Sequence, residues 1–362
     1  TASEKQVWTD KYLLESLRRS GYMPFMGRSS NSIIQARYEL NEEAGKTINI
    51  PLITRPVGQG VTGSQTLDGA EEELTNYNCA ISIDWRRNAV RVPKSTSYKT
   101  EIDLFDAARE ALKNWEAEKL RDDISRAMLS VVTTSDTTVA MASASTANRN
   151  AYSLANSDRL LFGASTANYS ATFATALGNC DTTNDKLTTA TASLGRRMAR
   201  SANPHIRPYQ VDDGREFYVA FCGARSFRDL KLDTAMVSAN RDARAREGSG
   251  YMNNPLFRDG DLWYDGILYR EVPEIDDICA ETGVDLNGAG ASSADVRPVF
   301  LAGVQAIGIA WGQEPTPRTD TKKDFEFRPG VAIEELLGVK KMAYNGKQHG
   351  LVTIFVAAAA DA

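Results

Sequence analysis

The stretch "TEIDLFDAAREALKNWEAEKLRDDISRAMLSVV", residues 100–132, is the clearest helix in the sequence. Its acidic residues Glu101, Asp103 and Asp106 favour the N-terminal end, because a carboxylate there interacts well with the helix dipole. At 1.5 Å per residue the helix would be about 45 Å long, which exceeds most helices of globular proteins. We therefore predict one very long helix that is buried along a single face, formed by Phe105, Leu112, Trp115, Leu120, Ile124, Met128 and Val131.

The other face of this helix is strongly charged. We interpret these charges as a solvated surface, because acids at helical spacing usually face water rather than forming an acid/base pair. The residues of this charged face are Glu110, Lys113, Glu116, Glu118, Lys119, Arg121, Asp122 and Asp123.

Two segments with alternating apolar residues precede the helix. They are "KTINIPLITR" at 46–55 and "LTNYNCAISIDW" at 74–85, so residues 56–73 form the tip of a long hairpin. Each arm of about 10 residues would extend about 33 Å, and a lone two-stranded hairpin is marginally stable in water. We therefore expect the hairpin to lie across a neighbouring surface, which is most simply another copy of the same chain.

The hairpin tip contains Gly58, Gly60 and Gly63 at the spacing of a dinucleotide-binding motif, with Asp84 at about the distance of a ribose-binding acid. That motif needs a helix that begins at its second or third glycine, whereas here the glycines are followed by "SQTLDGAEEELTNYN" and then a strand. The glycines are better explained as permissive points in a tip. Gly45-Lys46-Thr47 resembles the end of a P-loop, but Leu40 occupies the position of its earlier glycine.

The remaining segments differ in character. Residues 1–44 open with a short helical pattern at Trp8, Tyr12, Leu13 and Leu17, followed by an extended stretch, and read as an arm that lies on something else. Residues 133–185 are rich in Ser, Thr, Ala and Asn and predict loops with short irregular structure. A second helix is predicted over 185–202.

The second half of the chain is rich in predicted β-strands. We expect a buried strand at 215–223, a helix in "ARSFRDLKLD" at 224–233, and turns around short strands at 246–273. Further strands follow at 297–312 and 326–360, with Asn345-Gly346 as the turn between the last two.

Composition argues against several function classes. The 362 residues carry a formal charge of −5, so no basic face for nucleic acid dominates, and no apolar run reaches the ~20 residues of a membrane-spanning helix.

The N-terminal "TASEKQ" has no export signal, and the four scattered cysteines are expected to be buried, reduced thiols. His205 and His349 belong to no metal or triad pattern, and Asp259, Asp261 and Asp265 lack the order of a calcium loop. We therefore expect no catalytic residues, no cofactor and no metal site.

The order of arm, hairpin, long helix and returning strands resembles the major capsid proteins of tailed bacteriophages, which have the Hong Kong-97 phage coat fold. Within that group the chain is most similar to the coat proteins of the N4-like phages. The resemblance spans nearly the whole chain, except that the stretch at 133–170 departs from the family core and is interpreted as a local elaboration. It is carried by residues 25–40 ("FMGRSSNSIIQARYEL"), 58–78 ("GQGVTGSQTLDGAEEELTNYN"), 106–128, 300–313 and 350–359.

The resemblance implies an α+β chain divided into an arm at 1–45, an extended loop at 46–93, a peripheral domain with the spine helix at 94–202, an axial domain at 203–320, and returning strands at 321–362. It implies a self-assembling structural protein, not an enzyme, whose pentamers and hexamers form an icosahedral virion shell around double-stranded DNA after assembly in the host cytoplasm. Implied partners are other copies of the chain, portal, scaffolding and decoration proteins, and non-specifically contacted DNA, with no membrane. A cellular encapsulin-like shell protein of the same fold is the alternative, and a nucleotide-dependent enzyme would rest only on the rejected glycine motif.

Overall fold

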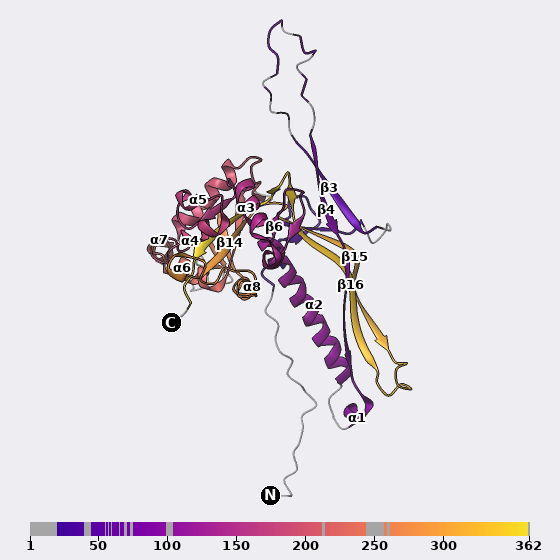
Figure 1. Ribbon diagram of the computed structural model, residues 1–362. Helices are drawn as coiled ribbons and strands as arrows, with labels where there is room; N and C mark the ends of the chain where they lie inside the picture. The colour runs from indigo at the N-terminus through magenta and orange to yellow at the C-terminus, as the bar shows by residue number, and fades with distance from the viewer. Residues whose placement is uncertain are drawn as a thin grey trace, which may run out of the picture.

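A computed structural model describes most of the chain. The described residues are 20–39, 45–54, 56, 58, 60–64, 66–68, 71–72, 75–98, 104–211, 214–243, 257–258 and 261–360. The predicted helical pattern around Trp8 and Tyr12 lies outside these residues. Figure 1 shows a rounded lobe of helices and strands from which long β-strands and one long helix run downward, while a β-hairpin extends upward.

The elongated part of the molecule is built on a five-stranded sheet in the order β1-β2-β15-β16-β5. Its longest strands are β15 (Ile307–Asp320) and β16 (Gly330–Lys341), which pair antiparallel. Strand β5 (Asp84–Arg91) pairs with β16 and forms one edge. On the other side lie β2 (Ile34–Arg37) and β1 (Met26–Gly27), both contributed by the N-terminal region.

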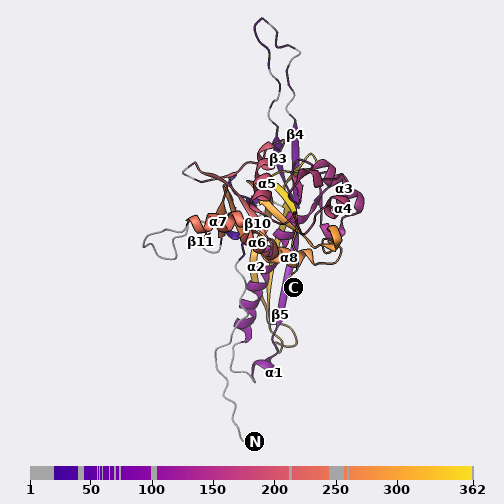
Figure 2. The same cartoon turned by 90° about the vertical axis from the view of Figure 1, so that its left-hand side faces the viewer.

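The long helix α2 (Leu104–Leu129) lies along this sheet (Figures 1 and 2). Leu112 is buried against Val331 and Ile333 of β16, so the helix does bury an apolar face on a sheet as predicted. Trp115 packs at the margin of this cluster and is only half-buried, which corrects the prediction of full burial. The side chain of Phe105 lies outside the described residues.

The predicted C-terminal end of the helix was wrong by three residues. Val131–Val132 form strand β6, which pairs with β7 (Thr138–Val139). Two consecutive β-branched residues favour a strand. The helix ends where the Ser130 hydroxyl donates to the carbonyl of Ala127 at 2.7 Å.

The lobe contains an eight-stranded sheet in the order β11-β12-β13-β10-β14-β19-β8, with β9 paired to β10. The strands at 296–302 and 351–357 are buried over their whole length, and the strand at 216–222 is buried except at Glu216. The strands are β8 (Leu160–Phe162), β9 (Tyr209–Gln210), β10 (Glu216–Cys222), β11 (Phe257–Arg258), β12 (Asp261–Tyr264), β13 (Ile267–Glu271), β14 (Val296–Ala302) and β19 (Leu351–Ala357).

Successive side chains of these strands enter two different cores. Phe221, Phe300 and Phe355 join a large cluster that continues into α2 and the five-stranded sheet. Their neighbours, such as Cys222, Leu301 and Ile354, face the opposite side, which is covered by the helices α5 (Thr189–Ser201) and α6 (Ala224–Leu232). The period-two alternation thus produces one core that joins both sheets and a second core that belongs to the lobe.

Helices surround the lobe sheet (Figure 2). The prediction of helices at 185–202 and 224–233 is confirmed by α5 and α6. The helices other than α2 are α1 (Lys94–Ser97), α3 (Thr146–Ala155), α4 (Phe173–Gly178), α5 (Thr189–Ser201), α6 (Ala224–Leu232), α7 (Thr234–Ala243) and α8 (Glu274–Cys279).

The prediction of irregular structure for residues 133–185 was wrong in part. This region contains α3, α4 and β8, and it buries Tyr152, Phe162 and Phe173 in the main core. Alanine supports helices, and Ser145 caps α3 by accepting a hydrogen bond from the Asn148 amide. A few aromatic residues are enough to anchor a segment whose other side chains are small.

The N-terminal region does not lie apart from the body. Tyr22 and Ile33 are completely buried, and Phe25 packs edge-on against Phe221 at 5.7 Å between ring centroids. Residues 20–39 therefore belong to the core of their own chain, which corrects the interpretation of this stretch as an arm on a separate surface.

Tight turns form at Asn345-Gly346, as predicted, and within the region at 246–273 where turns are predicted. Asn345 and Gly346 have φ of 55° and 72° and join β17 (Ala343–Tyr344) to β18 (Lys347–Gln348), two short strands that precede β19. Asp265 and Gly266 have φ of 50° and 64° and join β12 to β13. Positive φ at both central residues is the requirement of the tight two-residue hairpin turn.

Candidate assembly surfaces

The predicted hairpin is formed by β3 (Thr47–Ile53) and β4 (Asn76–Ser82), paired antiparallel from Thr47↔Ser82 to Ile53↔Asn76. Its base is anchored, because Ile50 and Ile81 are buried against Met342 and Tyr344. Its distal part is not, since Ile53 is 67% exposed. The hairpin therefore projects from the body (Figure 1) and carries apolar surface that its own chain leaves uncovered.

Within the described residues, the glycines of the tip are not followed by the helix that a dinucleotide-binding motif needs. Gly60 and Gly63 have φ of +67° and +68°, and a Cβ added to either would meet no described atom within 4 Å. Among the described residues between Gly58 and β4 there is no helix that could hold a pyrophosphate. Lys46 precedes a strand rather than a helix, and Asp84 begins β5, where its side chain accepts from the Trp85 amide.

A second projecting surface lies at the far end of the five-stranded sheet, where β15 turns into β16. Phe325 is fully exposed and Phe327 is 45% exposed in this turn, and Tyr98 after α1 is 95% exposed. The Lys94 amide donates to the carbonyl of Phe327 at 3.0 Å, which holds α1 beside the turn. Three exposed aromatic side chains at one tip are costly to leave in water.

Strand β5 forms an edge of the sheet that lies between these two surfaces. The side chain of Trp85 is 52% exposed and that of Val90 is 37% exposed. An edge strand with apolar side chains can pair with or be covered by another chain.

Strand β5 is tied to the long helix by buried charges. Arg86 Nε donates to Glu335 Oε1 of β16 at 2.5 Å, and its Nη1 donates to Asp123 of α2. Burial raises the pKa of Glu335 and of Asp123, and Arg86 opposes both shifts. Burial raises the pKa of Glu116 to about 7, with Glu335 as a further cause. One guanidinium thus compensates the buried carboxylate of Glu335.

The interpretation of the charged helix face as fully solvated was wrong. Arg121 is buried and pairs with Asp122 at 3.1 Å and with Glu274 of α8 at 3.1 Å. Asp123 is bound by Arg86. Glu110 and Lys113 are exposed, whereas the later residues of this face are partly or fully buried, and Arg121 and Asp123 pair with residues of the lobe and of β5.

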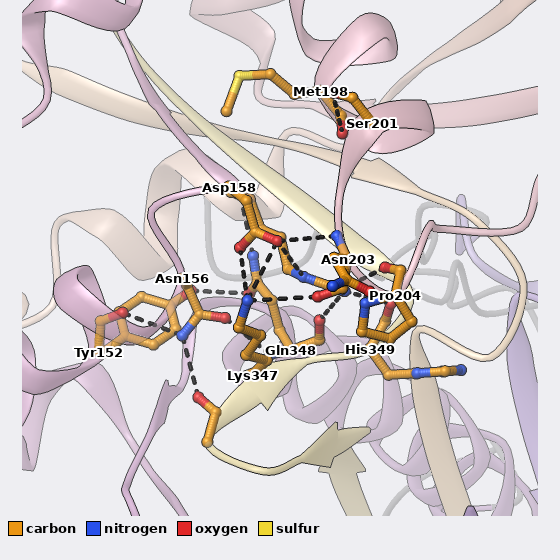
Figure 3. A network of polar contacts seen from close by, with 12 residues as sticks. Tyr152, Asn156, Asp158, Met198, Ser201, Asn203, Pro204, Lys347, Gln348 and His349 are labelled. Carbon is orange, nitrogen blue, oxygen red and sulfur yellow. Dashed lines mark hydrogen bonds and ion pairs between the residues drawn. The ribbon is translucent and has the colours of Figure 1, made fainter. Parts of the chain in front are cut away.

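Where the two sheets meet, a network of buried polar groups surrounds Gln348 (Figure 3). The Tyr152 hydroxyl of α3 donates to Gln348 Oε1 at 2.8 Å, and the backbone amide of Gln348 donates to Asn156 Oδ1 at 2.8 Å. Arg159 donates to the carbonyls of Gln348 and of Pro204, both at 2.5 Å. These bonds fix α3, β18 and the loop after α5 to one another.

Lys341, at the end of β16, is buried in the same region. Its Nζ donates to the carbonyl of Ser130 at 2.6 Å and to Gln348 Oε1 at 3.3 Å. Burial lowers the pKa of Lys341 to about 7. The lysine thus joins the end of α2 to the end of the strand on which that helix lies.

The reactive residue types serve structure in the described part of the chain. All four cysteines are free and buried as predicted, and burial raises the pKa of the Cys180 and Cys279 thiols to about 12. Burial lowers the pKa of His349 to about 4, which keeps the imidazole neutral. Asp261 and Asp265 pair with arginines, and Asp259 lies outside the described residues.

Neither a metal site nor a membrane span is found where the structure describes the chain. No group of three potential metal-ligating His, Cys, Asp or Glu side chains occurs among the described residues. No helix among them has the length and apolar character needed to cross a membrane. The expectation of no catalytic residue and no cofactor stays a prediction.

Comparisons with known proteins agree with this architecture. The family model for phage capsid proteins matches residues 2–360. The major capsid protein of Pseudomonas phage KPP25 is 27% identical over 384 residues, covering 99% of this chain and 96% of that protein.

Two solved structures extend the comparison. The cyanophage Pam1 capsid asymmetric unit contains a chain that is 47% identical, with a TM-score of 0.92, covering 100% of this chain and 98% of that one. The capsid of Ralstonia phage GP4 shares the fold at 21% identity with a TM-score of 0.73, covering 99% and 97% of the two chains.

The predicted α+β fold of the Hong Kong-97 type is confirmed by these likenesses, whereas the narrower similarity to the N4-like group stays a prediction. The family match covers nearly every residue of the two sheets, the long helix and the hairpin. The chain therefore belongs to the phage capsid protein family.

Proposed function

We propose that copies of this chain assemble as hexamers and pentamers into the icosahedral shell that encloses the double-stranded DNA of a tailed phage. The observation that carries the proposal is the hairpin β3–β4, whose base is anchored in its own chain while its distal part exposes Ile53. Covering apolar surface contributes roughly 25 cal/mol per Å². A neighbouring copy that receives the hairpin would supply this stabilisation.

The same reasoning applies to the other exposed surfaces. The aromatic tip of Tyr98, Phe325 and Phe327 and the edge strand β5 would each be covered by a neighbouring copy. Several separate contacts around one subunit, each weak alone, allow a closed assembly that is stable as a whole.

We also propose how the chain is divided into domains. An N-terminal segment would occupy residues 1–45, with residues 20–39 packed into the core of their own chain, and the extended loop would occupy residues 46–93. The peripheral domain would consist of α2 with β5, β15 and β16, and the axial domain of the lobe, with the strands at 321–362 returning through both. This division moves α3, α4 and α5 from the peripheral to the axial domain. Gly195 of α5 lies against Ile354 of the lobe sheet, Phe173 of α4 packs against Phe355, and Tyr152 of α3 joins the same core.

We further propose that the subunits assemble in the host cytoplasm and remain in the virion as its structural shell, without enzymatic activity. Portal, scaffolding and decoration proteins would be additional partners, and packaged DNA would be contacted without sequence preference. The family match to phage capsid proteins favours this role over an encapsulin-like cellular shell of the same fold.

The proposal is tested by expressing the full chain alone and examining the purified protein by negative-stain electron microscopy. Shells or capsomers are expected. A variant in which Asn-Gly replaces residues 56–73 should keep the circular dichroism of the wild type but form no shells. A control that replaces the same residues by a Gly-Ser segment of equal length separates the length of the tip from its sequence. A wild-type protein that stays a compact monomer at every concentration would refute the proposal.

A further inference from the structure

A polar cavity of about 610 Å³ lies where the N-terminal region meets the lobe. Its lining comes from Asn31 after β1, Arg200 at the end of α5, His205 and Arg207 in the following loop, Gln210 of β9 and Glu216 of β10. This volume is within the range of about 300–1,000 Å³ that is usual for small-ligand sites.

Two guanidinium groups line the cavity without a carboxylate partner. Among the described residues, neither Arg200 nor Arg207 forms an ion pair, and Arg207 Nη2 donates to the amide oxygen of Gln305 at 3.0 Å. By contrast Arg196, one turn earlier on α5, binds Asp265 at 2.6 Å. Arg200 also forms a hydrogen bond with the Tyr218 side chain, and both arginines are exposed, so their remaining N–H donors face solvent.

The lining of the cavity contains one acidic side chain, and its carboxylate already accepts a hydrogen bond. Glu216 is the acidic residue in the lining, and its Oε1 accepts from Gln210 Nε2 at 3.0 Å. His205 adds an imidazole, which donates through at least one nitrogen in either protonation state. The lining therefore has two fixed positive charges against one negative charge.

The wall of the cavity is fixed by backbone contacts. Asn31 Nδ2 donates to the carbonyl of Gln210 at 2.6 Å, and the Gln210 amide donates back to Asn31 Oδ1 at 3.2 Å. On the opposite side the Tyr218 hydroxyl donates to the carbonyl of Ile206 at 2.8 Å. A wall held in this way loses little conformational entropy when it binds a ligand.

We propose that this cavity binds a phosphate group through Arg200 and Arg207. A planar guanidinium matches the oxygens of a phosphate with two parallel hydrogen bonds, and a polar lining with few apolar groups suits an anion better than an apolar ligand. The phosphate belongs to the backbone of duplex DNA, and only this choice of source rests on the function proposed above.

The test measures binding of a fluorescent 20-base-pair duplex to the full chain by anisotropy over a range of salt concentrations. Arg200→Gln and Arg207→Gln should each weaken binding by about tenfold and reduce the slope of log affinity against log salt by about 0.9. Arg197→Gln is the matched control, because Arg197 is exposed on the same helix outside the cavity and carries the same charge. Arg200→Lys should keep the salt slope.

Calorimetry with inorganic phosphate distinguishes a phosphate of the DNA backbone from a phosphate of another source. If Arg200→Gln abolishes phosphate binding but leaves duplex binding unchanged, the site holds a phosphate that is not part of DNA. Equal effects of the three glutamine variants on both probes would overturn the proposal, because net charge alone would then explain binding. Unchanged binding of both probes with loss of shells would overturn it too and would assign the cavity to acidic side chains of a neighbouring copy. A wild-type chain that forms no shells yet shows the phosphate effect would refute only the proposed assembly.

Discussion

Arg86 offers the most demanding test of how the long helix is held to its sheet. Its side chain is 17% exposed and binds Glu335, whose side chain is 1% exposed, together with Asp123. Arg86→Met removes the charge that compensates Glu335 and keeps much of the apolar stem. Leaving one partner of a buried ion pair unpaired costs about 3–5 kcal/mol, a large part of the ~5–15 kcal/mol that stabilises a typical domain.

The effect of Arg86→Met should depend on pH. Burial raises the pKa of Glu335 and Arg86 lowers it, so without Arg86 the pKa lies higher still. As the pH falls through that value the carboxyl takes up a proton in the folded state, and the penalty disappears. The loss in free energy of unfolding should therefore be larger at pH 8 than at pH 5.

The assay is urea denaturation of unassembled subunits, followed by tryptophan fluorescence. The double variant Arg86→Met/Glu335→Leu should recover most of the lost stability, since a buried pair can often be replaced by apolar groups at little cost. Arg318→Met is the matched control, because Arg318 is 63% exposed and binds the adjacent Glu334. If Arg86→Met unfolds at the same urea concentration as the wild type, the tie between β5, β16 and α2 does not stabilise the fold.

Three further predictions concern the helix, the buried lysine and the hairpin tip. In urea denaturation, Leu112→Ala should lower the free energy of unfolding by about 2–5 kcal/mol, and Trp115→Ala by only ~2 kcal/mol because Trp115 is half-buried. The reverse order would mean that another face of α2 is buried. The free energy of unfolding should rise between pH 7 and pH 10, because Lys341 has a pKa of about 7 in the folded state against an ordinary 10.5. Lys341→Met should abolish this rise. Equal pH slopes for the wild type and the variant would contradict the argument. Gly60→Val forces a branched side chain into a left-handed backbone, at a cost of ~1–2 kcal/mol, and should reduce the yield of shells in electron micrographs. Gly178→Val is the control and should not reduce the yield, because a side chain at Gly178 meets open space. Micromolar binding of a dinucleotide to the wild type in calorimetry would contradict the role of the tip in assembly.

Local signals predicted much of the fold. The alternation around Ile50 and Ile81 predicted the hairpin, and the Asn345-Gly346 pair predicted a tight turn, because both depend on residues close in sequence. The burial of residues 20–39 could not be predicted, since Tyr22 and Phe25 meet Phe221 only after the lobe sheet has formed.

The partners of the charged helix face show the same limit. Asp123 finds Arg86 on β5 and Arg121 finds Glu274 on α8, so periodicity within the helix gives no sign of either pair. The cavity that Arg200 and Arg207 line is assembled from the N-terminal region, the end of α5, a loop and two strands. The sequence held no motif for it, because its lining is formed by the tertiary structure alone.

The central claim is that the projecting hairpin is completed by another copy of the chain. Electron cryomicroscopy of shells assembled from the full chain tests it most directly, by locating strands β3 and β4 relative to their own and the adjacent subunits. The account predicts that Ile53 and the residues beyond it lie against a neighbouring copy while Ile50 remains buried in its own. A shell in which the distal hairpin folds back onto its own subunit, or extends into solvent without any contact, would contradict it.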